Sequence, residues 1–167
     1  MSLQYQWKDK IYKLVNCTKE EIPSHSERVL SYWEQAGENP EDHYRAMEIS
    51  IDSGIAFKVI DNTNKEYLTV YFSYYKDSRQ CVLGHVFWTA TKFALAMGLH
   101  HVKNDLEIAS IFIMPLLPNY IPYSFLVDNT SVKLFHAYHQ LVIISTQTKK
   151  CNDFLRSYFD TDKVKEL

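Results

Sequence analysis

Glycine is the residue whose use most restricts what this chain can fold into. Only four glycines occur among its 167 residues, and no two of Gly37, Gly54, Gly84 and Gly98 are close in the sequence. Loops that bind phosphate need clustered glycines, because only a backbone without side chains can turn several N–H groups onto a pyrophosphate. The sequence therefore contains no Walker loop, no dinucleotide-binding fingerprint and no glycine-rich kinase loop.

The composition predicts one globular domain over residues 1–167. The length lies within the range of single domains, and 46% hydrophobic residues are enough to build a core without a metal or a disulfide. A formal charge of −2 with both signs interspersed indicates neither a nucleic-acid partner nor an anionic membrane.

The cysteines and the apolar runs predict a cytoplasmic protein. Three cysteines, far apart and without C-x-x-C spacing, are typical of reduced thiols. Lys8 and Lys10 interrupt any N-terminal apolar run, so we expect no signal peptide. The longest apolar stretch, 108–117, is too short to span a bilayer. We therefore expect no membrane partner.

The spacing of apolar residues predicts a chain of mixed helices and strands. Strands at 55–60, 66–75 and 81–88, separated by turn-rich segments, predict a meander. Asn39, followed by Pro40 and two acidic residues, is typical of a helix start. The other expected elements are a strand at 11–15, a helix ending before Gly37, a helix after Thr89, a strand at 123–127, a helix containing Val132, Phe135 and His139, a strand at 141–145 and a final helix through 154–159. The apolar run 106–114 fits either a buried strand or a continued helix, because periodicity does not separate the two.

This order of elements resembles the GCN5-related N-acetyltransferase (GNAT) fold. A second likeness is the segment Phe125–Phe135, FLVDNTSVKLF, which is similar to the strand–Asn–helix element that ends the cofactor half of GNAT proteins. It is closest to the Asn-Thr-Ser-x-x-x-Phe form of small GNAT-like proteins encoded by tailed phages. The resemblance implies an α+β (mixed α/β) fold, with a central mixed, splayed sheet flanked by helices. It also implies transfer of an acetyl group from acetyl-CoA to an amine.

The segment after the fourth strand departs from the family pattern. GNAT enzymes carry Arg/Gln-x-x-Gly-x-Gly/Ala there, whereas residues 87–95 of this chain contain no glycine. A helix start between Thr89 and Lys92 still offers amides, hydroxyls and one ammonium group to a phosphate. The resemblance therefore implies acetyl-CoA contacts from this strand, this turn and the later asparagine: Val86, Phe87, Thr89, Thr91, Lys92 and Asn129.

Two histidines are the catalytic candidates that the resemblance implies. His85, on the fourth strand, is placed to deprotonate an amine through water, since its pKa is ordinarily near neutral pH. His136 falls where the family has a tyrosine that protonates the leaving thiolate. The alternative for His85 is a partly buried histidine bonded to the backbone. Two sets of histidines are candidate metal ligands: His85 with His100 and His101, and His136 with His139. Neither set has a Cys, His, Asp or Glu companion at a metal-binding spacing, so we expect no metal.

An aromatic hairpin leaves a second function open. Period-two spacing predicts that Tyr67, Tyr71 and Tyr75 share one face, next to Phe72 and Tyr74, without basic neighbours. Such a set favours core packing or a protein contact over nucleic acid. One hypothesis is an acyltransferase acting on a small-molecule or peptide amine. The other is a non-catalytic, phage-type GNAT-like module that binds a protein partner or forms a homo-oligomer through this hairpin. A curved sheet around a hot-dog-type pocket gains support only if residues 81–88 are helical.

Overall fold

The described residues form a nine-stranded sheet. The computed structural model describes residues 3–114, 121–127, 133–136 and 139–167. The strands are β1 (Leu3–Trp7), β2 (Lys10–Asn16), β3 (Phe57–Asp61), β4 (Glu66–Tyr74), β5 (Cys81–Thr89), β6 (Ser110–Ile113), β7 (Lys133–His136), β8 (His139–Ser145) and β9 (Val164–Glu166). Their order across the sheet is β7-β8-β6-β5-β4-β3-β2-β1-β9. The helical segments are η1 (Lys19–Glu21), α1 (Ile22–Ser26), α2 (Leu30–Gln35), α3 (Pro40–Asp52), α4 (Lys92–Asn104), η2 (Ile121–Leu126) and α6 (Lys149–Phe159).

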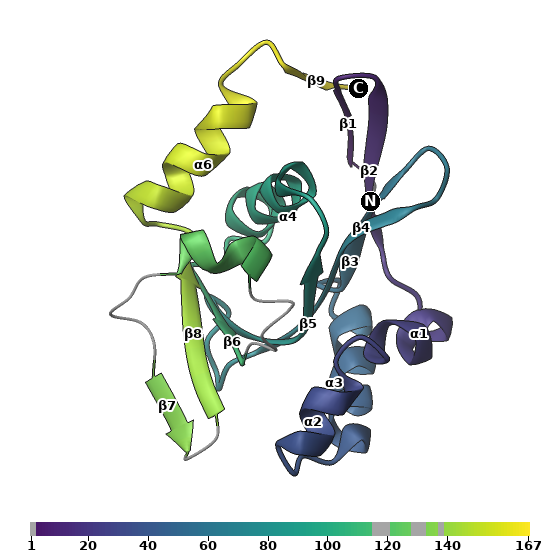
Figure 1. Cartoon of the computed structure of the whole chain (residues 1–167), viewed down its shortest axis with the longest axis vertical. Helices are drawn as coiled ribbons and strands as arrows, with labels where there is room; N and C mark the ends of the chain where they lie inside the picture. The colour runs from purple at the N-terminus through teal and green to yellow at the C-terminus, as the bar shows by residue number, and fades with distance from the viewer. Residues whose placement is uncertain (1–2, 115–120, 128–132, 137–138) are drawn as a thin grey trace.

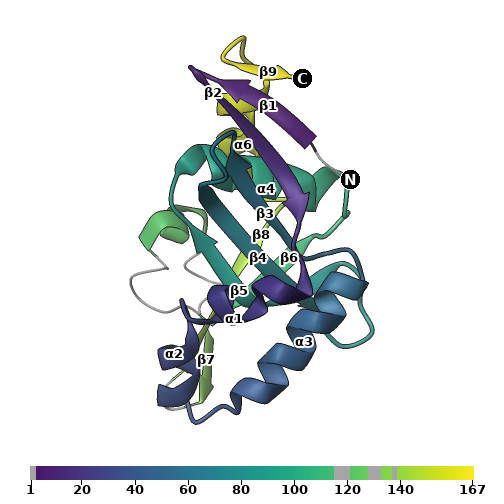
Figure 2. The same ribbon diagram turned by 90° about the vertical axis from the view of Figure 1, so that its right-hand side faces the viewer.

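The helices cover the sheet on both faces. Helices α1 to α3 lie on one face and α4 with α6 on the other, as the two views show (Figures 1 and 2). Helix α4 is buried on almost every side and packs in the larger core cluster with Phe57, Leu68 and Phe72 of the sheet. A helix that is apolar all round is stable only when it is covered on all sides, which is the position of α4. A second, smaller cluster joins α1 to α3 to Tyr71 and Val86.

The sheet opens between β5 and β6. These two strands are parallel and joined by α4, whereas the other paired strands are antiparallel. Their pairing covers only Cys81–Gly84 against Ser110–Ile113, although β5 continues to Thr89. Among the described residues, no strand pairs with the rest of β5 on that side. The result is a mixed, splayed sheet, as expected from the sequence.

Side-chain caps account for several of the helix boundaries. The Asn39 side chain accepts a hydrogen bond from the Glu41 N–H at the start of α3, which confirms the predicted cap. Thr91 and Thr148 cap α4 and α6 in the same way. In the described part of the chain, no helix is long and apolar enough to cross a membrane.

The strands at the two ends were not expected from the sequence. β1 pairs with both β2 and β9, so the two ends of the chain meet at one edge of the sheet (Figure 1). The rings of Tyr5 and Phe159 lie 5.4 Å apart, and those of Trp7 and Tyr158 lie 5.9 Å apart, so aromatic contacts also tie α6 to β1. These strands are three and five residues long, too short to give a periodic signal.

Two expected elements are wrong. Most of the strand predicted at 123–127 belongs to the 3-10 helix η2, in which Pro122 holds one of the first positions. The helix expected over Val132 and Phe135 is absent, since residues 133–136 form β7 and pair with β8. Asn129 lies outside the described residues. The undecided run 106–114 contains β6, which its pairing with β5 and β8 stabilises as a strand.

The predicted aromatic face is also corrected. A register shift between Val59 and Ile60 lets Tyr67 pack in the larger cluster with Tyr12, whereas Tyr71 packs in the smaller cluster on the opposite face. Tyr67, Tyr71 and Phe72 are all buried. The hairpin therefore serves the core, and only Tyr74 and Tyr75 stay partly exposed. Residues 81–89 form a strand, so the hot-dog interpretation loses its support.

Candidate active site

A small cavity lies where β5 and β6 separate. Its volume is about 30 Å³, which is room for about two water molecules. Trp33 of α2 and His43 of α3 line one side, and Phe87 and Tyr123 close another. His85 of β5 also lines it.

A β-bulge positions His85. Tyr71 of β4 pairs with Val86, and the next residue, Phe72, pairs with Gly84, so His85 is the extra residue of β5. Bulges re-aim side chains and are frequent beside active sites. The N–H of Phe72 donates to the buried Ser50 hydroxyl of α3, at 3.1 Å, so a side chain satisfies a backbone group at the irregularity. The bulge and α3 therefore stabilise each other.

His85 belongs to a hydrogen-bonded chain of four side chains. Its Nε2 lies 2.7 Å from the Ser73 Oγ, and its Nδ1 lies 2.9 Å from Nδ1 of His43. His43 Nε2 lies 2.6 Å from Oε2 of Glu38. The Trp33 indole stacks on the His43 imidazole and holds its plane. We call Ser73, His85, His43 and Glu38 the relay.

The protons of the relay can be assigned from the chemistry of its members. A carboxylate only accepts, so Nε2 of His43 carries the hydrogen that faces Glu38. In a neutral His43 ring, Nδ1 then accepts, and Nδ1–H of His85 must donate to it. Nε2 of His85 is left as the acceptor for the Ser73 hydroxyl. Burial lowers the pKa of His85 to about 4, so this ring is neutral at pH 7.

The other members of the relay were missed from the sequence. His85 was expected and lines the cavity, but both of its ring nitrogens bond to side chains and not to the backbone. Its role as a base stays a prediction. His43 and Ser50 lie on the buried side of α3 together with Met47. Polar residues at i and i+7, on the same helix face as an apolar residue at i+4, are the signal that identifies His43 in hindsight.

The predicted cofactor residues of β5 lie along the opening of the sheet. Val86 is fully buried toward α1 to α3, so only its backbone faces the strand edge. The Phe87 ring lines the cavity and meets Tyr123 at 90°, with centroids 5.0 Å apart. Thr89 is buried and donates to the Thr91 carbonyl.

The residues at the start of α4 differ in what they offer to a phosphate. The Thr91 hydroxyl accepts from the Ala94 N–H, so one amide of the first turn is already bonded within the chain. Lys92 is exposed, and its Nζ lies 5.1 Å from the centre of the Phe125 ring. Five of the six predicted cofactor residues therefore follow one another along β5 and α4, and the sixth, Asn129, is outside the described residues.

His136 does not lie on a helix. It ends β7, opposite His139, and β8 and β6 separate β7 from β5 in the sheet. The prediction that His136 protonates the leaving thiolate assumed that this residue lies on a helix. Because it lies on a strand, that role stays a prediction that this structure does not support.

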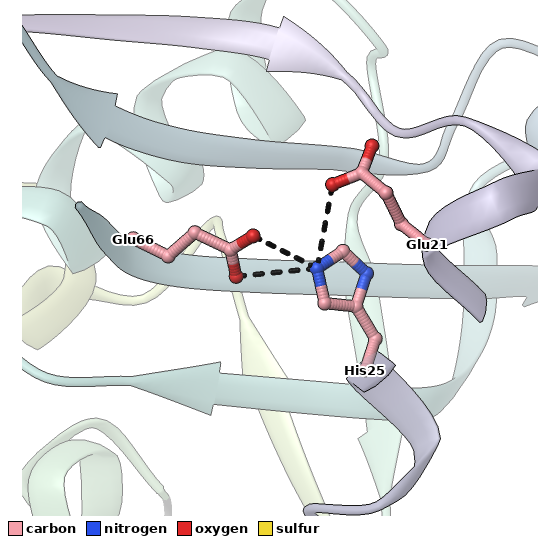
Figure 3. A group of neighbouring side chains, drawn as sticks. All are labelled: Glu21, His25 and Glu66. Carbon is pink, nitrogen blue, oxygen red and sulfur yellow. Dashed lines mark hydrogen bonds and ion pairs between the residues drawn. The ribbon is translucent and has the colours of Figure 1, made fainter. Parts of the chain in front are cut away.

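A second polar cluster lies under α1. His25 Nε2 lies 3.0 and 3.2 Å from the two carboxylate oxygens of Glu66 and 3.6 Å from Glu21 Oε2, so its ring sits between the two acids (Figure 3). Its Nδ1 lies 2.7 Å from the Tyr71 hydroxyl. Among the described residues, Glu21, His25 and Glu66 are close enough together to hold a metal ion.

Two cations already balance this cluster. Lys58 bonds to Glu21 and Arg28 bonds to Glu66, at 3.0 Å for the second pair. Burial by itself raises the pKa of Glu21 and of Glu66. The hydrogen bonds to Glu21, chiefly from Lys58, and those to Glu66, chiefly from His25, outweigh this effect, so the pKa of each carboxyl lies below its usual range. A divalent ion would have to displace both cations from their carboxylates. We therefore assign Glu21, His25 and Glu66 to an ion-pair network that anchors α1 to the sheet.

Solved structures of other proteins are similar to this chain over most of its length. The sequence matches no protein-family model and no curated protein. The Mycobacterium smegmatis protein RimJ, in complex with CoA-disulfide, aligns with 99% of this chain and 96% of its own, with a TM-score of 0.53 and 11% identity. A Bacillus anthracis acetyltransferase of the GNAT family aligns over 89% and 100% of the chains, with a TM-score of 0.55 and 12% identity. The fold of this chain is GNAT-like.

A further match extends this likeness to an enzyme of stated substrate. The ribosomal-protein-S5-alanine acetyltransferase of Vibrio fischeri aligns with 86% of this chain and 97% of its own, with a TM-score of 0.53 and 12% identity. The predicted fold class is confirmed by these structures. The three matches described are bacterial proteins, and the resemblance to phage proteins stays a prediction.

Proposed function

We propose that this protein is an N-acyltransferase that moves an acetyl group from acetyl-CoA to an amine of a small molecule or a peptide. The observation that carries the proposal is the position of His85. A β-bulge places it in the cavity at the opening of the sheet, with a hydrogen-bonded chain leading through His43 to Glu38. The GNAT-like acetyltransferases that share the fold support the same reaction class.

The residues along β5 and α4 fit CoA in two respects. The backbone edge of β5 from Val86 to Thr89 has no strand partner on the opening side among the described residues, so its amides and carbonyls are placed to bond the amides of pantetheine. The start of α4 follows directly, and the positive end of its dipole with the exposed Lys92 suits a pyrophosphate. When bound, acetyl-CoA supplies the activated acyl group.

The relay supplies the acid–base chemistry. An amine must lose a proton as it attacks an activated acyl group, and a histidine within one water of it can take that proton. His85 accepts the proton at Nε2, directly or through the Ser73 hydroxyl that occupies this nitrogen. His43, which Glu38 holds through its other nitrogen, orients the His85 ring for this transfer.

A second candidate is a GNAT-like module without catalysis, of the phage type or otherwise, that binds a protein partner. Two observations favour it. The cavity has room for only about two water molecules, which is too small for the thioester group of acetyl-CoA. Thr91 also uses the Ala94 amide, in the segment where the family's glycine loop binds the pyrophosphate.

Thermal unfolding with millimolar acetyl-CoA or CoA separates the two candidates. A ligand at about 100 times its dissociation constant stabilises the folded state by roughly 2.7 kcal/mol, which raises the Tm of a domain of this size by about 5–10 °C. Lys92→Ala should reduce this rise, whereas Lys163→Ala, an exposed lysine near the C-terminus, should not. A rise justifies an amine screen with wild type and His85→Gln. No rise with either ligand contradicts the acyltransferase and leaves the binding module.

A further inference from the structure

We propose that Ser73 is a nucleophile: its hydroxyl, activated by His85, takes an acyl group from an ester or thioester and forms an O-acylserine. For the natural acyl donor, an acyl-CoA thioester, this rests on the function proposed above. The nucleophilic chemistry itself needs only an activated acyl donor, so it can be tested without CoA.

The geometry is that of an activated hydroxyl. The base nitrogen lies 2.7 Å from the Ser73 oxygen, and the base is oriented through its other nitrogen by His43, which is held in turn by Glu38. Nucleophile, base and orienting group within hydrogen-bond reach are the general signature of nucleophilic catalysis. Here the orienting part has two members, an imidazole and a carboxylate.

The direction of the hydrogen bonds is the second argument. In the state with both imidazoles neutral, Nε2 of His43 donates to Glu38, Nδ1 of His85 donates to His43, and Nε2 of His85 accepts the Ser73 proton. The basic nitrogen of His85 is therefore bonded to the serine oxygen. Any group that reacts through this nitrogen must either displace Ser73 or react with it.

Ser73 also differs from other serines of the chain. The hydroxyls of Ser24, Ser26 and Ser157 donate to backbone carbonyls, which is the usual structural use of a helical serine. Ser73 instead bonds to a histidine ring, and its residue is partly exposed.

The reaction balances without a further reagent. The Ser73 oxygen forms a bond to the acyl carbon, and the hydroxyl proton moves to Nε2 of His85. The bond from the acyl carbon to the leaving sulfur or oxygen then breaks, and the leaving group takes that proton. An amine or water next attacks the serine ester, His85 accepts the proton of the attacking group, and the Ser73 oxygen leaves and regains a proton.

p-Nitrophenyl acetate is the probe that tests this proposal. With wild-type protein we expect a burst of about one p-nitrophenolate per chain, and peptide mass spectrometry should locate one acetyl group on Ser73. Ser73→Ala should abolish the burst, and His85→Gln should slow it by about 100-fold or more, as loss of a general base does. Ser157→Ala is the matched control and should keep the full burst. A folded wild type without acetyl on Ser73, or a full burst from Ser73→Ala, overturns the proposal.

Two further measurements keep the result independent of folding and of CoA. Ser73→Cys retains a nucleophile of similar size, so it should become acetylated at position 73 even if Ser73→Ala unfolds. The rise in Tm with CoA does not depend on the Ser73 hydroxyl. A CoA rise without acetylation of Ser73 therefore contradicts the nucleophile alone, whereas acetylation without a CoA rise contradicts the cofactor alone.

Discussion

Gly98 of α4 and Leu68 of β4 lie so close that a methyl group at position 98 would overlap the Cδ2 atom of Leu68. A Cβ there would also come 3.4 Å from Cε2 of Phe57. This glycine therefore allows the central helix to approach the sheet. Leu68 and Phe57 are both buried, so neither the Leu68 side chain nor the Phe57 ring can move aside freely.

Gly98→Ala should destabilise the protein despite the higher helix propensity of alanine. Overpacking costs about 1–3 kcal/mol, and the propensity gain returns about 1 kcal/mol. We expect a net loss of up to about 2 kcal/mol in the free energy of unfolding, measured by urea titration. Gly84→Ala is the control, because its Cβ would meet Ile113 Cγ1 at 3.6 Å, an ordinary contact. An equal effect of the two substitutions would refute the close approach at Gly98.

The burial of His85 predicts a specific loss of stability in mild acid. Its pKa falls to about 4 in the folded protein, chiefly through burial, against an ordinary value of 6.5. Above pH 6.5 both states are neutral at this ring. As the pH falls from 6.5 to 4 only the unfolded state binds the proton, so the free energy of unfolding decreases, by on the order of 3 kcal/mol in all.

His85→Gln removes this proton-binding difference. Urea unfolding of wild type and variant at pH 7, 5.5 and 4.5 should show the wild type losing more stability than the variant between the first and last value. The comparison cancels the protonation of groups elsewhere in the chain. Parallel losses in the two proteins would mean that His85 takes up a proton as easily when folded.

Glu66 should matter more to stability than an exposed acid. Its carboxylate bonds to His25, Arg28 and Thr69, and these side chains are partly or fully buried. Glu66→Gln leaves the Arg28 charge without its carboxylate, and we expect a loss of about 2 kcal/mol. Asp52→Asn breaks the exposed pair with Lys19 and should cost less than about 0.5 kcal/mol. Similar Tm values for the two variants would contradict the anchoring role of the Glu66 network.

The three thiols should react at different rates. Burial raises the pKa of Cys17 to about 12 and that of Cys151 to about 11, so neither forms a thiolate near pH 8. Cys81 is partly exposed. With Ellman's reagent at pH 8 we expect one thiol to react in the folded protein and three in guanidinium chloride. Cys81→Ser should remove the fast reaction, and a second fast thiol would show that α1 or α6 opens readily.

Local chemistry explains the elements that the sequence predicted correctly. Asn39 before Pro40 starts α3, and the strands predicted at 55–60, 66–75 and 81–88 between turn-rich segments are β3, β4 and β5. These signals depend on residues within a few positions of one another. The order of the elements, together with the segment 125–135, indicated the GNAT-like fold, because the helices between strands limit how the sheet can form.

Long-range pairing explains the errors. β7 is a strand because β8 is beside it, and β6 is a strand because it lies between β5 and β8, although its apolar run fits a helix equally well. The register shift that turns Tyr67 and Tyr71 to opposite faces also arises between strands. Such pairings involve partners far away in the sequence, so a local pattern does not contain them.

The candidate site also has a part that the sequence predicted and a part that only the structure revealed. The sequence by itself determined the scarcity of glycine, the GNAT-like order of elements, and the choice of His85 on the strand that borders the opening. Only the tertiary structure decided that His85 bonds to Ser73, His43 and Glu38, since these residues come from three different elements and a loop. The physical reason is that a β-bulge and a packed helix, and not sequence spacing, set the direction of the His85 side chain.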